Sequence, residues 1–136
     1  MIKKIIIILP IIIIFVVVIA LAASYSSIET NSEEPELIVN ADVIMPTKVS
    51  RPGCEEIDRC YIPSVIVIDS GQKVTWLNED SAFHSVTSGF YGDPTDLFDS
   101  GHLDPFESYS LDFNETGTFD YFCTLHPWMK GQVIVE

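Results

Sequence analysis

Residues 117–131 read GTFDYFCTLHPWMKG, and this stretch decides how the rest of the chain is interpreted. Alternate residues in its first half share one face, as in a β-strand, and Cys123 is the last residue on that face. His126 and Met129 follow at even spacings of three. Pro127 lacks a backbone N–H, so regular structure is expected to break there and the chain to turn. A thiol, an imidazole and a thioether can therefore converge at one end of the strand.

Further short segments carry strand signals, with β-branched or aromatic residues bounded by Gly, Pro, Asn and Asp. The dipeptide Ser70-Gly71 lies between two of them and predicts a tight turn, and therefore a hairpin. Seven or eight such strands predict an all-β fold, an antiparallel β-sandwich. The expected strands cover residues 37–45, 64–69, 72–77, 85–88, 107–113, 117–123 and 131–136.

Residues 89–105, GFYGDPTDLFDSGHLDP, form the longest stretch without a strand signal. We expect an irregular, acidic loop there, with a short helical turn near residues 94–98. His102 lies in this loop with no motif around it and is expected to be a solvated histidine. The acidic side chains of the loop are expected to form a solvated face, with docking of a partner as the alternative. They are Asp93, Asp96, Asp99 and Asp104.

The chain has 136 residues and a formal net charge of -13. Such an acidic balance argues against binding nucleic acid, whose phosphates require Lys and Arg. It favours a domain that meets a cationic partner, one with a basic docking surface, because opposite charges attract over a distance. The length is enough for one ordinary domain.

The N-terminus reads MIKKIIIILPIIIIFVVVIALAAS, in which Lys3 and Lys4 precede an uncharged apolar run over residues 5–23. That run is close to the ~20 residues that a helix needs to span a bilayer. The two lysines are expected to stay in the cytoplasm. Residues 1–24 are therefore interpreted as a membrane anchor or, alternatively, as a signal peptide cleaved near the small residues at 20–22.

Both alternatives place the remaining chain on the extracytoplasmic side, anchored to the membrane or secreted. Residues 25–35 are polar and predict a flexible linker, and the domain itself covers residues 36–136. Oxidising surroundings favour disulfides, so Cys54 and Cys60 are expected to pair and close a surface loop. Cys123 is then left over, and an unpaired cysteine in an exported protein needs another explanation.

A metal site explains Cys123, provided that a fourth ligand comes from elsewhere. His84 is the best candidate, because it follows the loop after a predicted strand and opens the next one. Two imidazoles, one thiolate and one weak thioether are the ligands of a type 1 copper centre. Zinc is the rival metal, but it rarely uses Met, and there are too few thiols for an iron–sulfur cluster.

The residues around these ligands resemble one family. The sequence CTLHPWM at residues 123–129 is similar to the short ligand loop of amicyanin and plastocyanin-like proteins. GTFDYFC matches their G-x-[YF]-x-Y-x-C strand, and VTWLNEDSAFHSV at residues 74–86 matches V-x-[WF]-x-N-x-[DE]-x-x-x-H-x-V. Residues 36–136 therefore resemble the cupredoxins, the small blue copper proteins.

The resemblance implies a Greek-key sandwich that carries single electrons on one copper ion. The ligands it implies are His84, Cys123, His126 and Met129. Many members carry Asn after the first ligand histidine, where this chain has Ser85. We expect the Ser85 hydroxyl to reach Thr124 and tie the two ligand loops together, and its N–H to donate to the Cys123 sulfur.

The residues favour one of three classes of function. An electron shuttle is favoured, with electrons leaving through the ring edge of His126 and an apolar rim formed by Pro127, Trp128 and Phe83. A copper enzyme, such as a nitrite reductase, needs a second metal site, for which only His102 remains among the histidines. Copper delivery or storage favours exchangeable Met- or Cys-rich sites, and three Met in the chain do not suggest it. Around the site, the Ser85 N–H is expected to donate one hydrogen bond to the Cys123 thiolate. Pro127 has no N–H and therefore cannot donate a second one.

Overall fold

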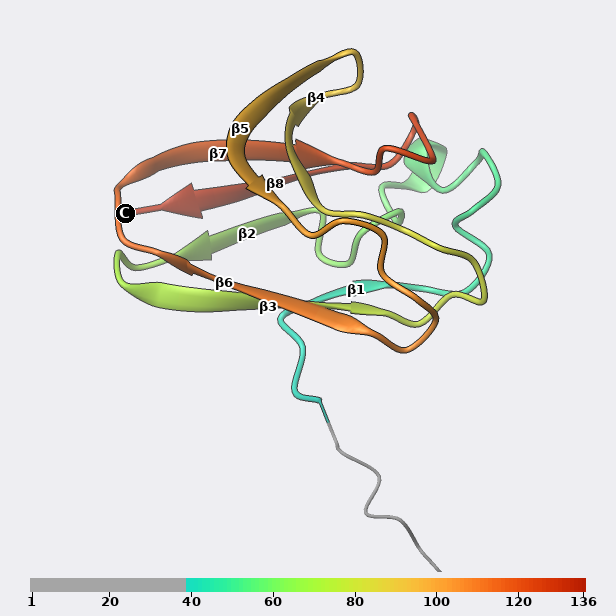
Figure 1. Cartoon of the computed structure of the whole chain (residues 1–136), viewed down its shortest axis with the longest axis horizontal. Helices are drawn as coiled ribbons and strands as arrows, with labels where there is room; N and C mark the ends of the chain where they lie inside the picture. Colours follow the sequence, from blue (N-terminus) through green and yellow to red (C-terminus); the bar gives the residue numbers. More distant parts are fainter. Residues whose placement is uncertain (1–38) are drawn as a thin grey trace, which may run out of the picture. The chain divides into compact units, whose positions relative to one another are not determined.

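A computed structural model describes residues 39–136, which form a β-sandwich of two sheets (Figure 1). The smaller sheet has the strand order β1-β3-β6, and the larger has the order β2-β8-β7-β4-β5. The described elements are β1 (Val43–Met45), the 3-10 helix η1 (Glu55–Ile57), β2 (Val65–Ile68), β3 (Gln72–Asn78), β4 (Thr87–Phe90), β5 (Asp93–Asp99), β6 (Ser108–Phe113), β7 (Gly117–Phe122) and β8 (Lys130–Val135).

The anchor or signal peptide predicted at residues 1–24 and the linker at residues 25–35 lie outside the described residues. Over residues 39–136, no helix combines the length and the apolar character that crossing a membrane requires.

The all-β, two-sheet architecture is confirmed, but the prediction of a purely antiparallel sandwich is wrong. β1 pairs with β3 in parallel, and β2 pairs with β8 in parallel. The hairpin predicted at Ser70-Gly71 is also wrong, because β2 and β3 belong to different sheets. Gly71 has a φ of 87°, so the turn exists, but it carries the chain across the sandwich. Both strands then bury one face against the core between the sheets.

The prediction of an irregular loop over residues 89–105 is wrong for residues 89–99, and no helical turn occurs at residues 94–98; residues 100–105 do lie outside the strands. β4 and β5 form an antiparallel hairpin that projects from the sandwich (Figure 1). β5 is an edge strand whose residues are nearly all exposed, so it lacks the alternation by which half-buried strands are found. Gly89, at φ 98°, permits the irregular register, because a Cβ there would lie 2.6 Å from the carbonyl oxygen of Asp93.

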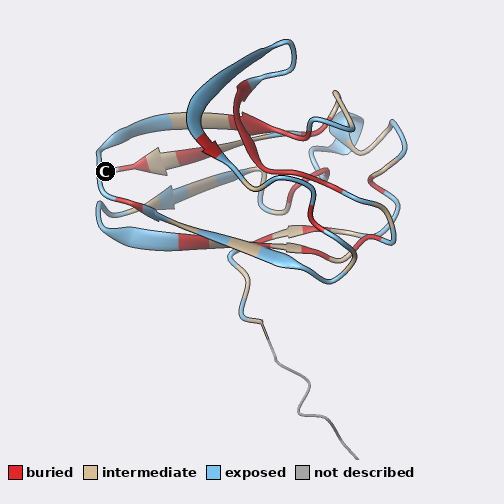
Figure 2. Ribbon diagram, viewed as in Figure 1, coloured by how far each residue is buried: buried red, intermediate tan, exposed pale blue. Residues whose placement is uncertain are grey.

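The core lies between the two sheets, where buried segments of both face each other (Figure 2). Trp76 on β3 is fully buried and meets the ring of Tyr121 on β7 edge-on, with centroids 5.5 Å apart. Tyr61 packs edge-on against Tyr121 at 4.9 Å. Two residues after Tyr121, Cys123 is fully buried. The aromatic core therefore fixes the end of β7, where the predicted thiol ligand lies.

Candidate metal centre

Three of the predicted ligands lie on the turn between β7 and β8. The turn is closed by three backbone hydrogen bonds, in which the N–H of His126 donates to Cys123 (3.3 Å), that of Met129 to His126 (2.9 Å) and that of Cys123 to Met129 (3.2 Å). Cys123 and Met129 are fully buried, whereas His126 is half-buried. The turn therefore directs two sulfur side chains inward and leaves the imidazole between core and surface.

His84 reaches the same end of the sandwich from the loop between β3 and β4. Backbone hydrogen bonds in both directions (3.3 and 2.8 Å) join it to Leu103. Asn78, at the end of β3, organises this loop through its side-chain amide, which donates to the carbonyls of Ala82 (2.8 Å), Leu103 (3.1 Å) and Asp104 (3.1 Å). The ligand histidine is thus held in a loop that is braced internally.

The ring nitrogens and the thiol converge on one point. The Nδ1 atoms of His84 and His126 are 3.1 Å apart, and the Sγ of Cys123 lies 3.8 Å from the first and 3.5 Å from the second. A point equidistant from three such atoms is about 2.0 Å from each, within the ~2.0–2.3 Å typical of metal bonds to nitrogen and sulfur. These three residues therefore fit a single metal ion without rearrangement, and Met129 lies buried at the end of the same turn.

The expected tie between the two ligand loops is present. The hydroxyl of Ser85 accepts from the N–H of Thr124 at 2.9 Å and lies 3.0 Å from its hydroxyl. The N–H of Ser85 donates to the Cys123 sulfur at 3.4 Å. Tyr61 adds a further link, because its hydroxyl donates to the Ser85 carbonyl at 2.6 Å. Serine in place of asparagine therefore still joins the loops.

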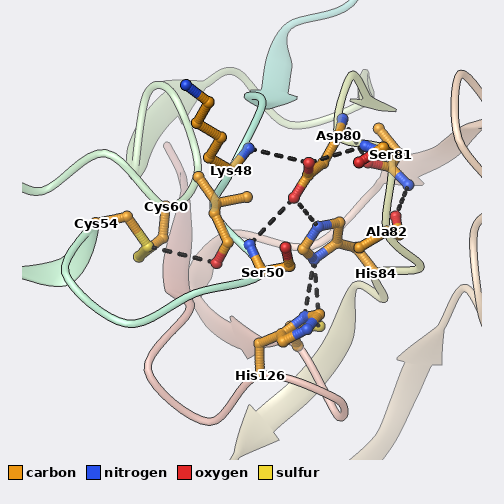
Figure 3. Close-up of polar contacts among 12 residues, drawn as sticks. Lys48, Ser50, Cys54, Cys60, Asp80, Ser81, Ala82, His84 and His126 are labelled. Atoms are coloured by element: carbon orange, nitrogen blue, oxygen red, sulfur yellow. Dashed lines mark hydrogen bonds and ion pairs between the residues drawn. A yellow bond between two sulfur atoms is a disulfide. The ribbon is translucent and has the colours of Figure 1, made fainter.

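Asp80 is a buried carboxylate beside the site that was not predicted to be functional. Its Oδ2 lies 3.1 Å from the Nε2 of His84 (Figure 3). Burial opposes ionisation of Asp80, but hydrogen bonds from the Lys48 N–H, the His84 ring and the Ser50 and Ser81 N–H groups outweigh it and hold its pKa well below the usual range. Burial lowers the pKa of His84, although the hydrogen bond to Asp80 opposes this. A neutral imidazole, which binds metals, is thereby favoured.

The signal that would have found Asp80 and Asn78 was already in the sequence. Both occupy specified positions of the segment VTWLNEDSAFHSV, but only its histidine was interpreted as functional. An acidic residue in an acidic chain gives no indication by itself that it is buried.

The predicted disulfide between Cys54 and Cys60 is present, and Cys123 is free. The loop that precedes this disulfide contacts the ligand turn, because Trp128 Nε1 donates to the Val49 carbonyl at 3.0 Å. The Trp128 ring packs near that of His126, with centroids 5.3 Å apart.

Of the residues named for electron exit, Pro127 and Trp128 follow His126 directly in the chain, and Phe83 directly precedes His84. Pro127 and Trp128 are half-buried and Phe83 is exposed, so all three are accessible to solvent. His102 is exposed, in agreement with its interpretation as a solvated residue.

Comparison with known proteins identifies the family to which a chain with this set of ligands belongs. The model of copper-binding proteins of the plastocyanin/azurin family matches residues 53–136. The chain belongs to this family. As a cupredoxin, it is 35% identical over 117 residues to amicyanin of Paracoccus versutus, covering 85% of this chain and 83% of that protein. Plastocyanin of Scenedesmus fuscus is 34% identical over 86 residues, covering 56% and 86%.

Among solved structures, the cupredoxin domain is similar to the purple cupredoxin from Nitrosopumilus maritimus. The TM-score is 0.64 at 32% identity, covering 71% of this chain and all of that chain. The protein is therefore a type 1 copper electron-transfer protein, an electron carrier and not an enzyme, with a His–Cys–His–Met site. Cupredoxins shuttle electrons between redox proteins.

Proposed function

We propose that this cupredoxin is a one-electron shuttle on the extracytoplasmic side of a membrane. The observation that carries the proposal is the donor triangle of His84, Cys123 and His126, whose ligand atoms lie 3.1 to 3.8 Å apart. Bound copper supplies the one-electron couple between Cu(I) and Cu(II). Thiolate and thioether favour the reduced ion, while imidazole suits both oxidation states. A site held this firmly changes little between them, which favours fast electron transfer.

Electrons are proposed to leave through the half-buried ring of His126. Among the ligand side chains it is the one that reaches toward solvent, since those of His84, Cys123 and Met129 are fully buried. Phe83, adjacent to the ligand His84, is 52% exposed and supplies an apolar contact surface, together with Pro127 and Trp128. Such surfaces suit weak redox encounters that bury little area and dissociate quickly.

The charge of the exported part supports a partner with a basic docking surface. Lys3 and Lys4 are two of the seven basic residues, so five remain against 20 acidic ones beyond the N-terminal segment, a net charge of -15. This charge steers a basic partner from a distance, and the apolar rim makes the close contact.

The extracytoplasmic location is supported by two observations. The Cys54–Cys60 disulfide is typical of oxidising compartments. Residues 5–23 are an uncharged apolar run after two lysines, which favours export of the chain beyond residue 23. Protease added to intact cells or spheroplasts should degrade a membrane-attached domain, whereas a domain that survives until the membrane is opened is on the other side.

Stopped-flow reduction of the copper-loaded protein by a basic cytochrome tests the shuttle and its exit. We expect the rate to fall as salt rises, because charges beyond about 8 Å are screened at ~0.15 M. Phe83→Ala should slow the reaction at every salt concentration. Phe90→Ala is the matched control, since Phe90 is 53% exposed but lies at the end of β4. Equal rates for the two variants would place the exit elsewhere, and a rate independent of salt would remove the steering.

A further inference from the structure

One motif of the sequence takes no part in the copper site. Residues 114–116 read Asn-Glu-Thr, which fits the acceptor pattern Asn-x-Ser/Thr of N-linked glycosylation. Among the asparagines of the chain, Asn114 alone stands two residues before a serine or threonine. Such a short pattern also occurs by chance, so its meaning depends on where it lies in the fold.

The motif forms an exposed turn between β6 and β7, and all three of its residues are exposed. The backbone of the turn is held in place, because the Gly71 N–H donates to the Phe113 carbonyl (2.6 Å) and the Ser70 hydroxyl to the Asn114 carbonyl (2.9 Å). The side-chain amide of Asn114 forms no hydrogen bond to another residue within residues 39–136. The turn therefore presents a free amide to solvent on a fixed backbone.

This turn lies at the end of the sandwich opposite to the copper ligands. β7 begins directly after the motif at Gly117, and its last residue, Phe122, precedes the ligand Cys123. A strand of 6 residues spans ~20 Å, at ~3.3 Å for each residue. Figure 1 shows the β6–β7 turn beside the C-terminus, away from the turn between β7 and β8. A bulky group on Asn114 therefore leaves the electron exit at His126 accessible.

An apolar groove lies beside the motif. Its volume is about 300 Å³, and its lining includes Leu97, Leu111, Phe119 and Asn114 itself. Leu97 is 67% exposed and belongs to β5, the edge strand of the larger sheet. An edge strand with exposed apolar side chains can associate with other chains unless something covers it. A group attached to Asn114 starts at the wall of this groove.

We propose that Asn114 is an N-glycosylation site whose oligosaccharide covers the apolar groove beside β5. In the reaction, the amide nitrogen of Asn114 forms a bond to the anomeric carbon of the first sugar. The bond between that carbon and a phosphate oxygen of a lipid-linked oligosaccharide donor breaks, the lipid phosphate leaves, and the amide proton passes to a base of the transferase. A glycan is bulky and solubilising, so it shields an edge that would otherwise be sticky.

This inference rests on the proposed extracytoplasmic location, because the pattern is modified on surface loops of exported proteins. The test is mass spectrometry of the peptide that contains Asn114, taken from the full chain isolated from the cells that produce it naturally. This readout does not depend on how the N-terminus is processed. We expect the peptide to carry the additional mass of an oligosaccharide on Asn114.

Variants expressed in the same cells identify the acceptor. Asn114→Gln and Thr116→Ala should each lose the additional mass, whereas Thr116→Ser should keep it because serine also fits the pattern. Asn40→Gln is the matched control, since Asn40 is exposed but lies outside such a pattern, and it should keep the glycan. Additional mass that persists in Asn114→Gln would refute the assignment.

Failure of the site and failure of the proposed location give different results. An unmodified Asn114 in a domain that external protease degrades on intact cells would refute the glycosylation site and leave export standing. A domain that protease reaches only after the membrane is opened, with Asn114 unmodified, would refute both.

Two further measurements test where the glycan lies and what it does. Copper-loaded Asn114→Gln should be reduced by a basic cytochrome at the rate of the glycosylated protein, because the turn is far from the exit; a changed rate would contradict that placement. The same variant should bind more of a fluorescent dye that recognises apolar surfaces, whereas Asn40→Gln should not. Equal dye binding by Asn114→Gln and the glycosylated protein would refute the covering of the groove.

Discussion

The hydroxyl of Ser85 accepts a hydrogen bond from the backbone N–H of Thr124 at 2.9 Å, and this contact joins the loop of His84 to the turn that carries the other ligands. Ser85 is fully buried, and its own N–H points to the Cys123 sulfur. One residue therefore fixes the distance between the two halves of the copper site and also contacts its thiolate.

Ser85→Ala should loosen this connection without removing the N–H···S bond. We expect the free energy of unfolding to fall by about 1 kcal/mol, because the Thr124 N–H loses its acceptor. The copper-loaded variant should stay coloured. Ser110→Ala, on β6, removes a more exposed hydroxyl contact and should cost less. Thermal unfolding of both variants measures the two losses of stability. Equal losses in Ser85→Ala and Ser110→Ala would contradict a special role for the Ser85 contact.

Met129 is expected to tune the copper potential rather than to hold the ion. Its side chain is fully buried, and a thioether bonds weakly to Cu(II). Met129→Gln should retain copper and have a lower reduction potential, since an oxygen donor favours Cu(II). Metal analysis and redox titration measure the two effects separately. Complete loss of copper, or an unchanged potential, would contradict this assignment.

The disulfide between Cys54 and Cys60 should be present in the native protein, with Cys123 free. Mass spectrometry under non-reducing conditions should find the peptides of Cys54 and Cys60 linked. Replacing both with Ala should lower the free energy of unfolding by about 2 kcal/mol, as expected for closing a short loop. Cross-linking of Cys123 to either residue in native protein would be incompatible with both the pairing and the copper site.

Gly131 on β8 faces the ring of Tyr121 on β7, with which it is paired in register. A Cβ at this position would overlap the Tyr121 ring. Gly131→Ala should therefore destabilise the fold by about 1–3 kcal/mol through overpacking. Thr118→Ala, an exposed change on the neighbouring strand, should stay within ~0.5 kcal/mol. Unfolding in urea measures the stability of both variants. A Gly131→Ala variant as stable as the unmodified protein would contradict the prediction, because the Tyr121 ring would then have moved aside without cost.

The copper ligands were predictable because metal binding requires specific side chains at specific spacings. Cys123, His126 and Met129 have few other reasons to lie at intervals of three, and the segment ending in His84 supplied the fourth. The strands of the core were also predictable, since β7 and β8 each carry alternating apolar side chains toward the core. Both kinds of information are local in the sequence.

The features that could not be predicted depend on distant contacts or on exposed surface. Ser70-Gly71 indicates a turn, but nothing in it specifies that β2 pairs with β8 and β3 with β6. β5 is almost wholly exposed, so its pairing with β4 leaves no hydrophobic pattern. The carboxylate of Asp80 is held in place by N–H groups of Lys48 and Ser50, which lie 30 residues or more away in the chain. An acidic residue in a predicted loop does not by itself indicate that distant backbone N–H groups hold its carboxylate.

Cys123 is the thiolate ligand of the type 1 copper site, together with His84, His126 and Met129. The most direct test is the visible and EPR spectrum of the protein with one equivalent of Cu(II). We expect an intense visible colour from charge transfer between thiolate and Cu(II), and its complete absence in Cys123→Ser, which should keep its fold by circular dichroism. A colourless Cu(II) complex of the unmodified protein, or a Cys123→Ser variant with the same spectrum, would contradict the type 1 copper site.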